Sequence, residues 1–224
     1  ATQFKEADGT PYGQGGAIVI AEGVQANLTL KNTKISPKIY IPPMNVMEGA
    51  SCNLTLEGEN TLIPRLIHST VGQGFFDRVP AIWVPEGAKL TVSEASTGVL
   101  TAESAYENAV IGGWKYGHAG TIIIDGGTLK LDNDGDINSI TNISGPCIGG
   151  YKKLDGIIIN GGKIEATCAQ SAPIGMALAM VESLGTIIVN GGTIVTRHQT
   201  RDGTYPYYAD GIGDTQHKTA VNVR

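Results

Sequence analysis

Short apolar strands separated by glycine-containing turns repeat along the whole chain. In six segments a run of alternating apolar residues leads into a tight turn, and a second alternating run follows it. The segments begin at Ala17, Met44, Ala81, Thr121, Gly156 and Thr186. Reuse of one turn along a chain is typical of a solenoid, in which each coil buries its inner face by stacking on its neighbours.

The turn itself begins with an acidic or amide residue and continues with glycine. Aligned on that residue, the six turns start at Glu22, Glu48, Glu86, Asp125, Asn160 and Asn190. Glycine adopts the positive φ of a sharp corner at little steric cost. We therefore predict that these turns stack, and that Asp125, Asn160 and Asn190 hydrogen-bond to one another from coil to coil.

A second marker falls between the turns and predicts a third strand in each coil. An inward isoleucine followed by glycine occurs in Val110–Gly113, Cys147–Gly150, Pro173–Gly175 and Gly211–Gly213. Three strands per coil indicate an all-β fold, a single-stranded right-handed parallel β-helix of about six coils. We predict one domain over residues 1–224.

Strand alternation assigns side chains to the two faces of each strand. Before the turn, the residue between two inward apolar residues points outward. These outward residues are Val19, Asn45, Trp83, Ile123, Ile158 and Ile188. Because most of them are apolar, we predict one exposed apolar stripe, covered either by Met176–Leu184, which has helical composition, or by a partner.

Composition narrows the classes of partner. The chain has 224 residues, 31 of them glycine, and a net charge of −5. Nucleic acids and acidic membranes usually require a basic stripe, so neither is expected as a partner. No apolar run approaches the roughly 20 residues of a membrane-spanning helix, so no membrane insertion is expected. The chain reads as a monomeric module cut from a longer protein.

Three cysteines, Cys52, Cys147 and Cys168, show no CxxC spacing. Neither a disulfide framework nor a zinc knuckle is indicated. We expect small buried apolar residues, with a Cys147–Cys168 pair as the alternative.

The sequence also resembles a known repeat. The succession NLTLEGENTL, VPEGAKLTV, GTIIIDGGTLKL, CIGG, GIIINGGKIEA and GTIIVNGGTIVT is similar to a glycine-rich β-helical domain of surface proteins from Gram-positive gut bacteria. The resemblance covers about Gly15 to Asp214, although PIGM and GIGD lack the second glycine. It implies an extracellular location on the bacterial cell surface and carbohydrate binding. It carries over no site residues, because the shared positions belong to the scaffold.

Aromatic residues that interrupt the repeat are the candidate binding residues. Tyrosine and tryptophan present a flat apolar face with a polar edge, which suits recognition of glycans and proteins. The candidates are Trp83, Phe75, Phe76, Trp114, Tyr116, Tyr151, Arg201, Tyr205, Tyr207 and Tyr208. Trp114 and Tyr151, one coil apart, are expected either to form a shelf for neutral or acidic sugars or to pack over the glycine bend. The Tyr205–Tyr208 loop either binds a ligand or caps the solenoid.

No cofactor is expected, although Asp132, Asp134 and Asp136 offer alternating oxygen ligands of the kind that calcium takes. Ile137 stands where an EF-type loop needs glycine, so a solvated acidic turn is the preferred interpretation. The catalytic motifs GxSxG and HExxH are absent from the sequence.

We therefore expect a non-catalytic adhesion module that recognises glycans or a host glycoprotein. The alternatives are a domain that binds a host protein such as an immunoglobulin, a passive spacer, and a polysaccharide lyase or glycosidase.

Overall fold

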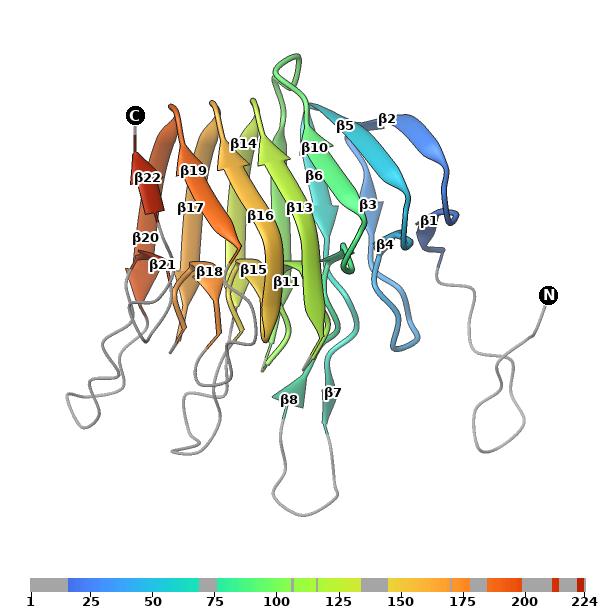
Figure 1. The fold of residues 1–224 in the computed structure, drawn as a ribbon. Coiled ribbons are helices and arrows are strands. Elements are labelled where there is room, and N and C mark those ends of the chain that lie inside the picture. Colours follow the sequence, from blue (N-terminus) through green and yellow to red (C-terminus); the bar gives the residue numbers. More distant parts are fainter. Residues whose placement is uncertain are drawn as a thin grey trace, which may run out of the picture.

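The protein is a right-handed parallel β-helix, seen in a computed structural model that describes residues 16–68, 76–105, 107–115, 117–133, 145–169, 171–177, 185–198, 211–213 and 221–223. For residues 67, 68, 76, 77, 198 and 221–223 the backbone alone is described. Every strand pair within the three large sheets is parallel, and each of the first six coils contributes one strand to each sheet, followed by β21 and β22 in the first and second sheets (Figure 1). The predicted fold class is confirmed.

The three sheets run the length of the stack. The first sheet contains β1 (Ile18–Ile20), β4 (Met44–Val46), β9 (Ile82–Trp83), β12 (Ile111–Gly112), β15 (Ile148–Gly150), β18 (Ile174–Met176) and β21 (Ile212–Gly213). The second contains β2 (Gln25–Lys31), β5 (Ser51–Glu57), β10 (Lys89–Val92), β13 (His118–Ile124), β16 (Lys153–Ile159), β19 (Thr186–Val189) and β22 (Val221–Val223). The third contains β3 (Lys34–Ile35), β6 (Glu59–Leu62), β11 (Val99–Ser104), β14 (Thr128–Asn133), β17 (Lys163–Cys168) and β20 (Thr193–His198).

A short antiparallel hairpin, β7 (Ile67–His68) with β8 (Phe76–Asp77), lies in the connection between β6 of the third sheet and β9 of the first. It projects from the edge of the stack from which the β3–β4 connection also leaves (Figure 1). This edge is the corner between the third and first sheets.

The six similar turns do not form one column, and this part of the prediction is wrong. Glu22, Glu48 and Glu86 lie at the corner between the first and second sheets, whereas Asp125, Asn160 and Asn190 lie between the second and third. The register shows the shift, because Leu90, after the turn in its coil, pairs with Ile122, which precedes the next turn. Both corners need a left-handed glycine, so their local sequences look alike: Gly87 has φ 75° and Gly127 has φ 74°.

The predicted outward stripe divides for the same reason. Val19, Asn45 and Trp83 follow one another on the outside of the first sheet. Ile123, Ile158 and Ile188 form a separate, half-buried row on the outside of the second. Continuous coverage by one segment is therefore not needed, and residues 178–184, expected to provide it, lie outside the described residues.

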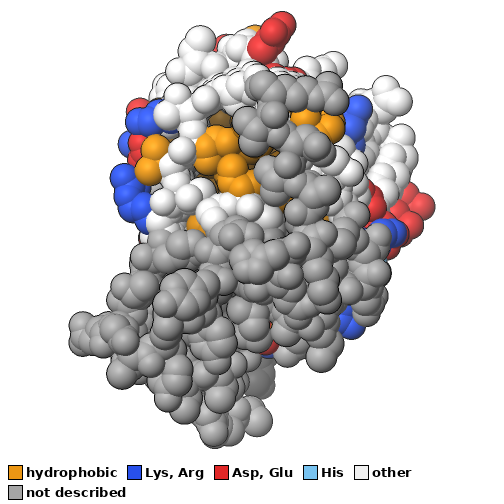
Figure 2. All heavy atoms as spheres, turned by 60° about the vertical axis from the view of Figure 1, so that its left-hand side comes forward, with side chains coloured by type: hydrophobic (Ala, Val, Ile, Leu, Met, Phe, Trp, Pro, Cys, Tyr) orange, Lys and Arg blue, Asp and Glu red, His pale blue; other side chains and the backbone are white. Residues whose placement is uncertain are grey.

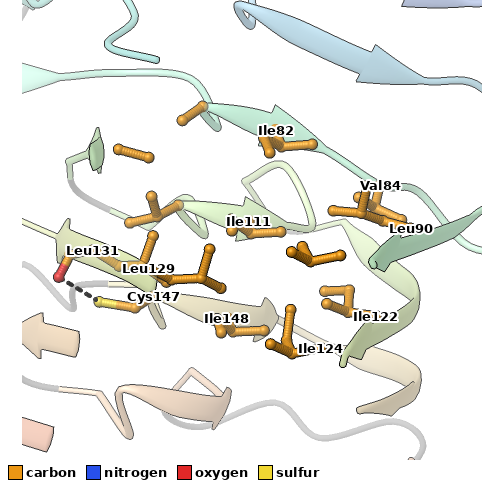
Figure 3. Packing of buried hydrophobic residues seen from close by; sticks show 14 of the residues in the cluster. Ile82, Val84, Leu90, Ile111, Ile122, Ile124, Leu129, Leu131, Cys147 and Ile148 are labelled. Carbon is orange, nitrogen blue, oxygen red and sulfur yellow. Dashed lines mark hydrogen bonds between the residues drawn. The ribbon is translucent and has the colours of Figure 1, made fainter. Parts of the chain in front are cut away.

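Stacked aliphatic side chains fill the interior. Ile82, Ile111 and Ile148 succeed one another in the first sheet, and all three are fully buried (Figure 3). At the C-terminal end of the stack the core residues Ile194 and Ile212 are only partly buried. Figure 2 turns that end forward and shows hydrophobic side chains at the surface there. Each coil thus depends on a neighbour to cover it.

Side-chain hydrogen bonds reinforce one corner, as predicted. The Asn160 side-chain amide donates to the Asp125 carboxylate at 2.6 Å, and the Asn190 amide donates to the Asn160 carbonyl oxygen at 2.7 Å. The column Asp125–Asn160–Asn190 is confirmed.

A buried polar group closes the corner between the third and first sheets. The Asn133 side-chain amide donates to the carbonyl oxygens of Asn108, Gly145 and Pro146 at 2.6, 2.8 and 3.3 Å. Buried backbone carbonyl groups outside the strands need such donors, because burying a carbonyl group without a hydrogen bond costs about 1–3 kcal/mol of folding free energy. Asn133 thereby fixes where the long connections of this corner begin.

The three cysteines are buried and none of them forms a disulfide, as the sequence indicates. Burial raises the pKa of the Cys52 thiol to about 11, and burial also raises the pKa of Cys147 well above its usual value. The thiolate is the reactive form, so both residues are chemically quiet at neutral pH.

We expect the folded protein at pH 8 to show almost no thiol reactive toward a disulfide reagent within minutes, and to show all three in 8 M urea. Raising the pH to 9 should change the rate of labelling of the folded protein little, since the pKa values of Cys52 and Cys147 are raised by burial. Stoichiometric labelling of the folded protein at pH 8 would contradict this arrangement.

Candidate aromatic groove

A groove runs along the corner between the first and second sheets. It has a volume of about 390 Å³ and crosses three successive coils. Its described lining residues are Glu48, Trp83, Pro85, Glu86, Trp114, Gly117 and His118. We call it the aromatic groove.

Two tryptophans form its apolar wall. The Trp83 and Trp114 rings meet edge to face, with centroids 5.6 Å apart and planes at 90°. Tyr40, from the β3–β4 connection, contacts Trp114 from another side at 6.2 Å and 74°. Such edge-to-face pairs add about 0.5–1.5 kcal/mol beyond burial, so the rings hold one another in place. Trp83 and Trp114 are both partly exposed and therefore available to a ligand.

The local sequence explains how two large rings fit here. Trp83 points outward from β9, and its partner in the next coil is Gly112. Because glycine places no side chain over Trp83, the space beside the ring is open to Trp114, two residues further along. The coil bearing Trp114 turns through Gly117, whose amide donates to the Trp114 carbonyl oxygen at 2.6 Å.

Charged groups from three coils line or brace the opposite wall. The Glu86 carboxylate contacts His118 Nδ1 at 2.7 Å and also pairs with the Lys153 ammonium group. Hydrogen bonds from Lys153 and then from His118 lower the pKa of Glu86. Glu86 is therefore ionised at neutral pH and held in position, with its charge partly compensated.

A missing side chain allows a contact that skips a coil. The Asp155 carboxylate accepts a hydrogen bond from the Gly87 amide at 2.9 Å, although the β13 coil lies between them. Gly120 falls between Ala119 and Thr121, whose partners are Leu154 and Gly156, so it lies opposite Asp155. Its lack of a side chain leaves the path clear. This bond ties the Glu86 turn to the coil that also carries Lys153.

Comparisons of the chain with protein-family models, curated proteins and solved structures return no match. The groove must therefore be interpreted from its own chemistry.

The structure brings together two of the predicted site residues, Trp83 and Trp114. Tyr151 occupies the position equivalent to Trp114 one coil later, but only 6% of it is exposed, so a shelf formed by Trp114 and Tyr151 is not available. Phe76 lies in β8, and its side chain is not described. Outside the described residues lie Phe75, Tyr116, Arg201, Tyr205, Tyr207 and Tyr208.

Sequence reasoning missed the other members of the groove. Glu48 and Glu86 look like scaffold because they begin repeated turns, and His118 looks isolated in its loop. The segment IYIPP, which contains Tyr40, does not match the repeat. The feature that could have indicated the groove is the pairing of Trp83 with Gly112 in the next coil. An outward tryptophan beside a glycine leaves space that no side chain fills.

The calcium prediction stays a prediction. Asp132 lies at the end of β14, and Asp134 and Asp136 fall outside the described residues. Within the described part of the chain, there is no group of three or more metal-binding side chains, and no helix long and apolar enough to cross a membrane.

Proposed function

We propose that this protein is a non-catalytic extracellular module of a bacterial cell surface that binds glycans in the aromatic groove. The observation that carries the proposal is the right-angled Trp83–Trp114 pair beside the carboxylates of Glu48 and Glu86. The apolar face of a sugar ring packs well on an indole, while its hydroxyl groups donate hydrogen bonds to carboxylates. The groove supplies both kinds of contact, already positioned, on one rigid scaffold.

The charges of the groove favour neutral or amino sugars over acidic ones. Its described acidic lining residues are Glu48 and Glu86, and His118 is the other titratable residue of the lining. Lys153, whose ammonium group could otherwise attract an acidic sugar, is paired with Glu86. An acidic sugar would bring its carboxylate next to Glu48 and Glu86 and would be repelled.

Removal of either tryptophan ring should abolish most of the affinity. We expect Trp83→Ala and Trp114→Ala each to weaken binding about 30-fold or more, since truncating a central aromatic anchor costs about 2 kcal/mol or more. The measurement is a glycan array followed by calorimetric titration with the best neutral ligand. Trp114→Phe, which keeps a flat ring, should retain part of the affinity.

Ile158→Ala is the matched control, because Ile158 is an outward apolar residue on the second sheet and does not line the groove. It should bind like the unmodified protein. If the array shows no neutral or amino-sugar ligand, or if the tryptophan variants bind unchanged, the proposal is wrong. A passive spacer or a host-protein ligand would then be the better interpretation.

A further inference from the structure

A second hollow lies at the corner between the third and first sheets. It has a volume of about 700 Å³. Its described lining residues are Ser36, Pro37, Lys38, Ile63, Pro64, Arg65, Leu66 and Arg78. We call it the basic hollow, because each charged residue in that set is a cation. Three cations around one hollow contrast with the net charge of −5 of the whole chain.

The backbone that carries Arg78 is firmly held. The Asn108 side-chain amide donates to the Arg78 carbonyl oxygen at 2.8 Å, and Arg78 forms an antiparallel bridge with Ala105. Its guanidinium group pairs through Nη1 with the Glu103 carboxylate. Its Nε is buried and has no hydrogen-bond partner among the described residues. Arg78 is thus a preoriented cation whose donors are only partly used.

Arg65 joins the two chain segments that form the walls. Its Nη1 donates to the Lys38 carbonyl oxygen at 2.5 Å, which ties the segment before β7 to the β3–β4 connection. A guanidinium group has five N–H donors in a fixed planar fork, so most of this fork stays available. Arg65 and Lys38 are both exposed at the mouth of the hollow.

Apart from Ser36, the rest of the lining is apolar. Pro37 and Pro64 are buried, and Leu66 is 41% exposed although it is a large aliphatic residue. A simple inorganic ion would contact the cations and leave the exposed Leu66 side chain uncovered. A hollow of several hundred cubic ångströms, with cations and an apolar surface, matches a ligand of a few sugar rings bearing negative groups.

We infer that the basic hollow is a second binding site, which takes the oxyanion groups of an acidic oligosaccharide. Arginine binds planar carboxylates and sulfates through two parallel N–H donors, whereas lysine acts as a point charge. Arg65 and Lys38 make the direct contacts at the mouth, and Arg78, whose charge is partly compensated by Glu103, stands behind them. Sulfate esters and uronate carboxylates share this chemistry.

The two sites are separate but share one segment. The β3–β4 connection contributes Lys38 to the lining of the basic hollow, and its Tyr40 ring packs against Trp114 of the aromatic groove. The aromatic groove repels acidic sugars, while the basic hollow attracts them. The inference goes beyond the proposed function and does not depend on it.

The test is calorimetric titration with a heparin-derived tetrasaccharide, with tetragalacturonate, and with the neutral tetramer of N-acetylglucosamine. We expect one or both acidic ligands to bind with an affinity that falls steeply with salt. Sulfated and uronate ligands distinguish the two sources of the oxyanion. The double variant Lys38→Ala/Arg65→Ala should weaken acidic binding at least tenfold, and Arg65→Lys should recover only part of the loss of Arg65→Ala.

Lys130→Ala is the charge-matched control, because Lys130 is exposed on β14 and does not line the hollow. It should change acidic binding less than twofold, and so should Trp83→Ala. Failure of both acidic ligands to bind would overturn the inference, as would equal effects of Arg65→Ala and Lys130→Ala. Loss of acidic binding in Trp83→Ala would also overturn it. Each of these results leaves neutral-sugar binding in the aromatic groove to be judged by its own variants.

Discussion

Gly149→Ala is expected to destabilise the fold by roughly 4 kcal/mol or more, or to prevent soluble expression. Gly149 has φ 142°, a conformation that is essentially restricted to glycine. In addition, a Cβ atom at this position would lie 1.7 Å from the Gly175 carbonyl oxygen in the next coil. Because Gly112, Gly175 and Gly213 repeat the same geometry, relief at one coil would force a clash at the next. Urea unfolding followed by circular dichroism measures the loss.

Gly156→Ala is the matched control for this prediction. Gly156 lies in β16 and pairs with Thr121 and Thr186, two residues that carry side chains at the same position. A Cβ atom there would approach nothing closer than 3.5 Å. We expect a midpoint within the error of the unmodified protein, or slightly above it. Equal behaviour of the two alanine variants would contradict the stacked glycine column.

Ile122→Ala is expected to cost about 2–5 kcal/mol, which is the range for removing a large aliphatic side chain from a core. Ile122 is fully buried and stacks between Leu90 and Ile157. The cavity has rigid coils on both sides and cannot collapse easily. The urea midpoint and its slope, measured by tryptophan fluorescence and by circular dichroism, report the change.

The adjacent residue provides a control of the same type on the opposite face. Ile123 points outward from the same strand and is half-buried between Thr91 and Ile158. We expect Ile123→Ala to cost less than about 1 kcal/mol. If Ile123→Ala were as costly as Ile122→Ala, the assignment of inner and outer faces in β13 would be wrong.

Strand alternation predicted faces well because its period is fixed by the pleat of the backbone. Leu54, Leu90, Ile122 and Ile157 all point inward as expected. The third strand marked by isoleucine and glycine is also correct, and so is the ladder from Asp125 to Asn190. The inner and outer faces depend on near neighbours in the chain, whereas the ladder joins residues 35 and 30 positions apart that begin the same type of turn.

Register between coils was harder to predict because the two corners use the same turn chemistry. Glu86-Gly87 and Asp125-Gly126-Gly127 both end in a glycine with φ near 75°, yet they belong to different corners. The local difference is small, because one glycine follows the glutamate whereas two glycines follow the aspartate. A stronger indicator is the isoleucine–glycine strand. It aligns Ile111 with Ile82 in the first sheet, so the apolar run that follows, from Thr121 to Ile124, must belong to the second sheet.

The aromatic groove, our proposed binding surface, was only partly predictable from the sequence. Trp83 and Trp114 stood out as aromatic residues that break the repeat, but their contact required the register Trp83–Gly112. Tyr151 looked equivalent to Trp114 in sequence and is nevertheless buried. Similar positions in successive coils can have different surroundings, because the connections in which they lie differ in length. The β12–β13 connection, with Trp114, is longer than the β15–β16 connection, with Tyr151.

The corner fixed by Asn133 has a consequence for how this architecture changes over time. Connections of very different length leave from it, from the few residues between β17 and β18 to the whole β7–β8 hairpin, while the strands on either side keep their parallel register. Insertions at that edge are thermodynamically inexpensive, since closure entropy grows only slowly with length. The fold therefore tolerates insertions of different length at this edge, one coil at a time, without a change in the parallel sheets on either side.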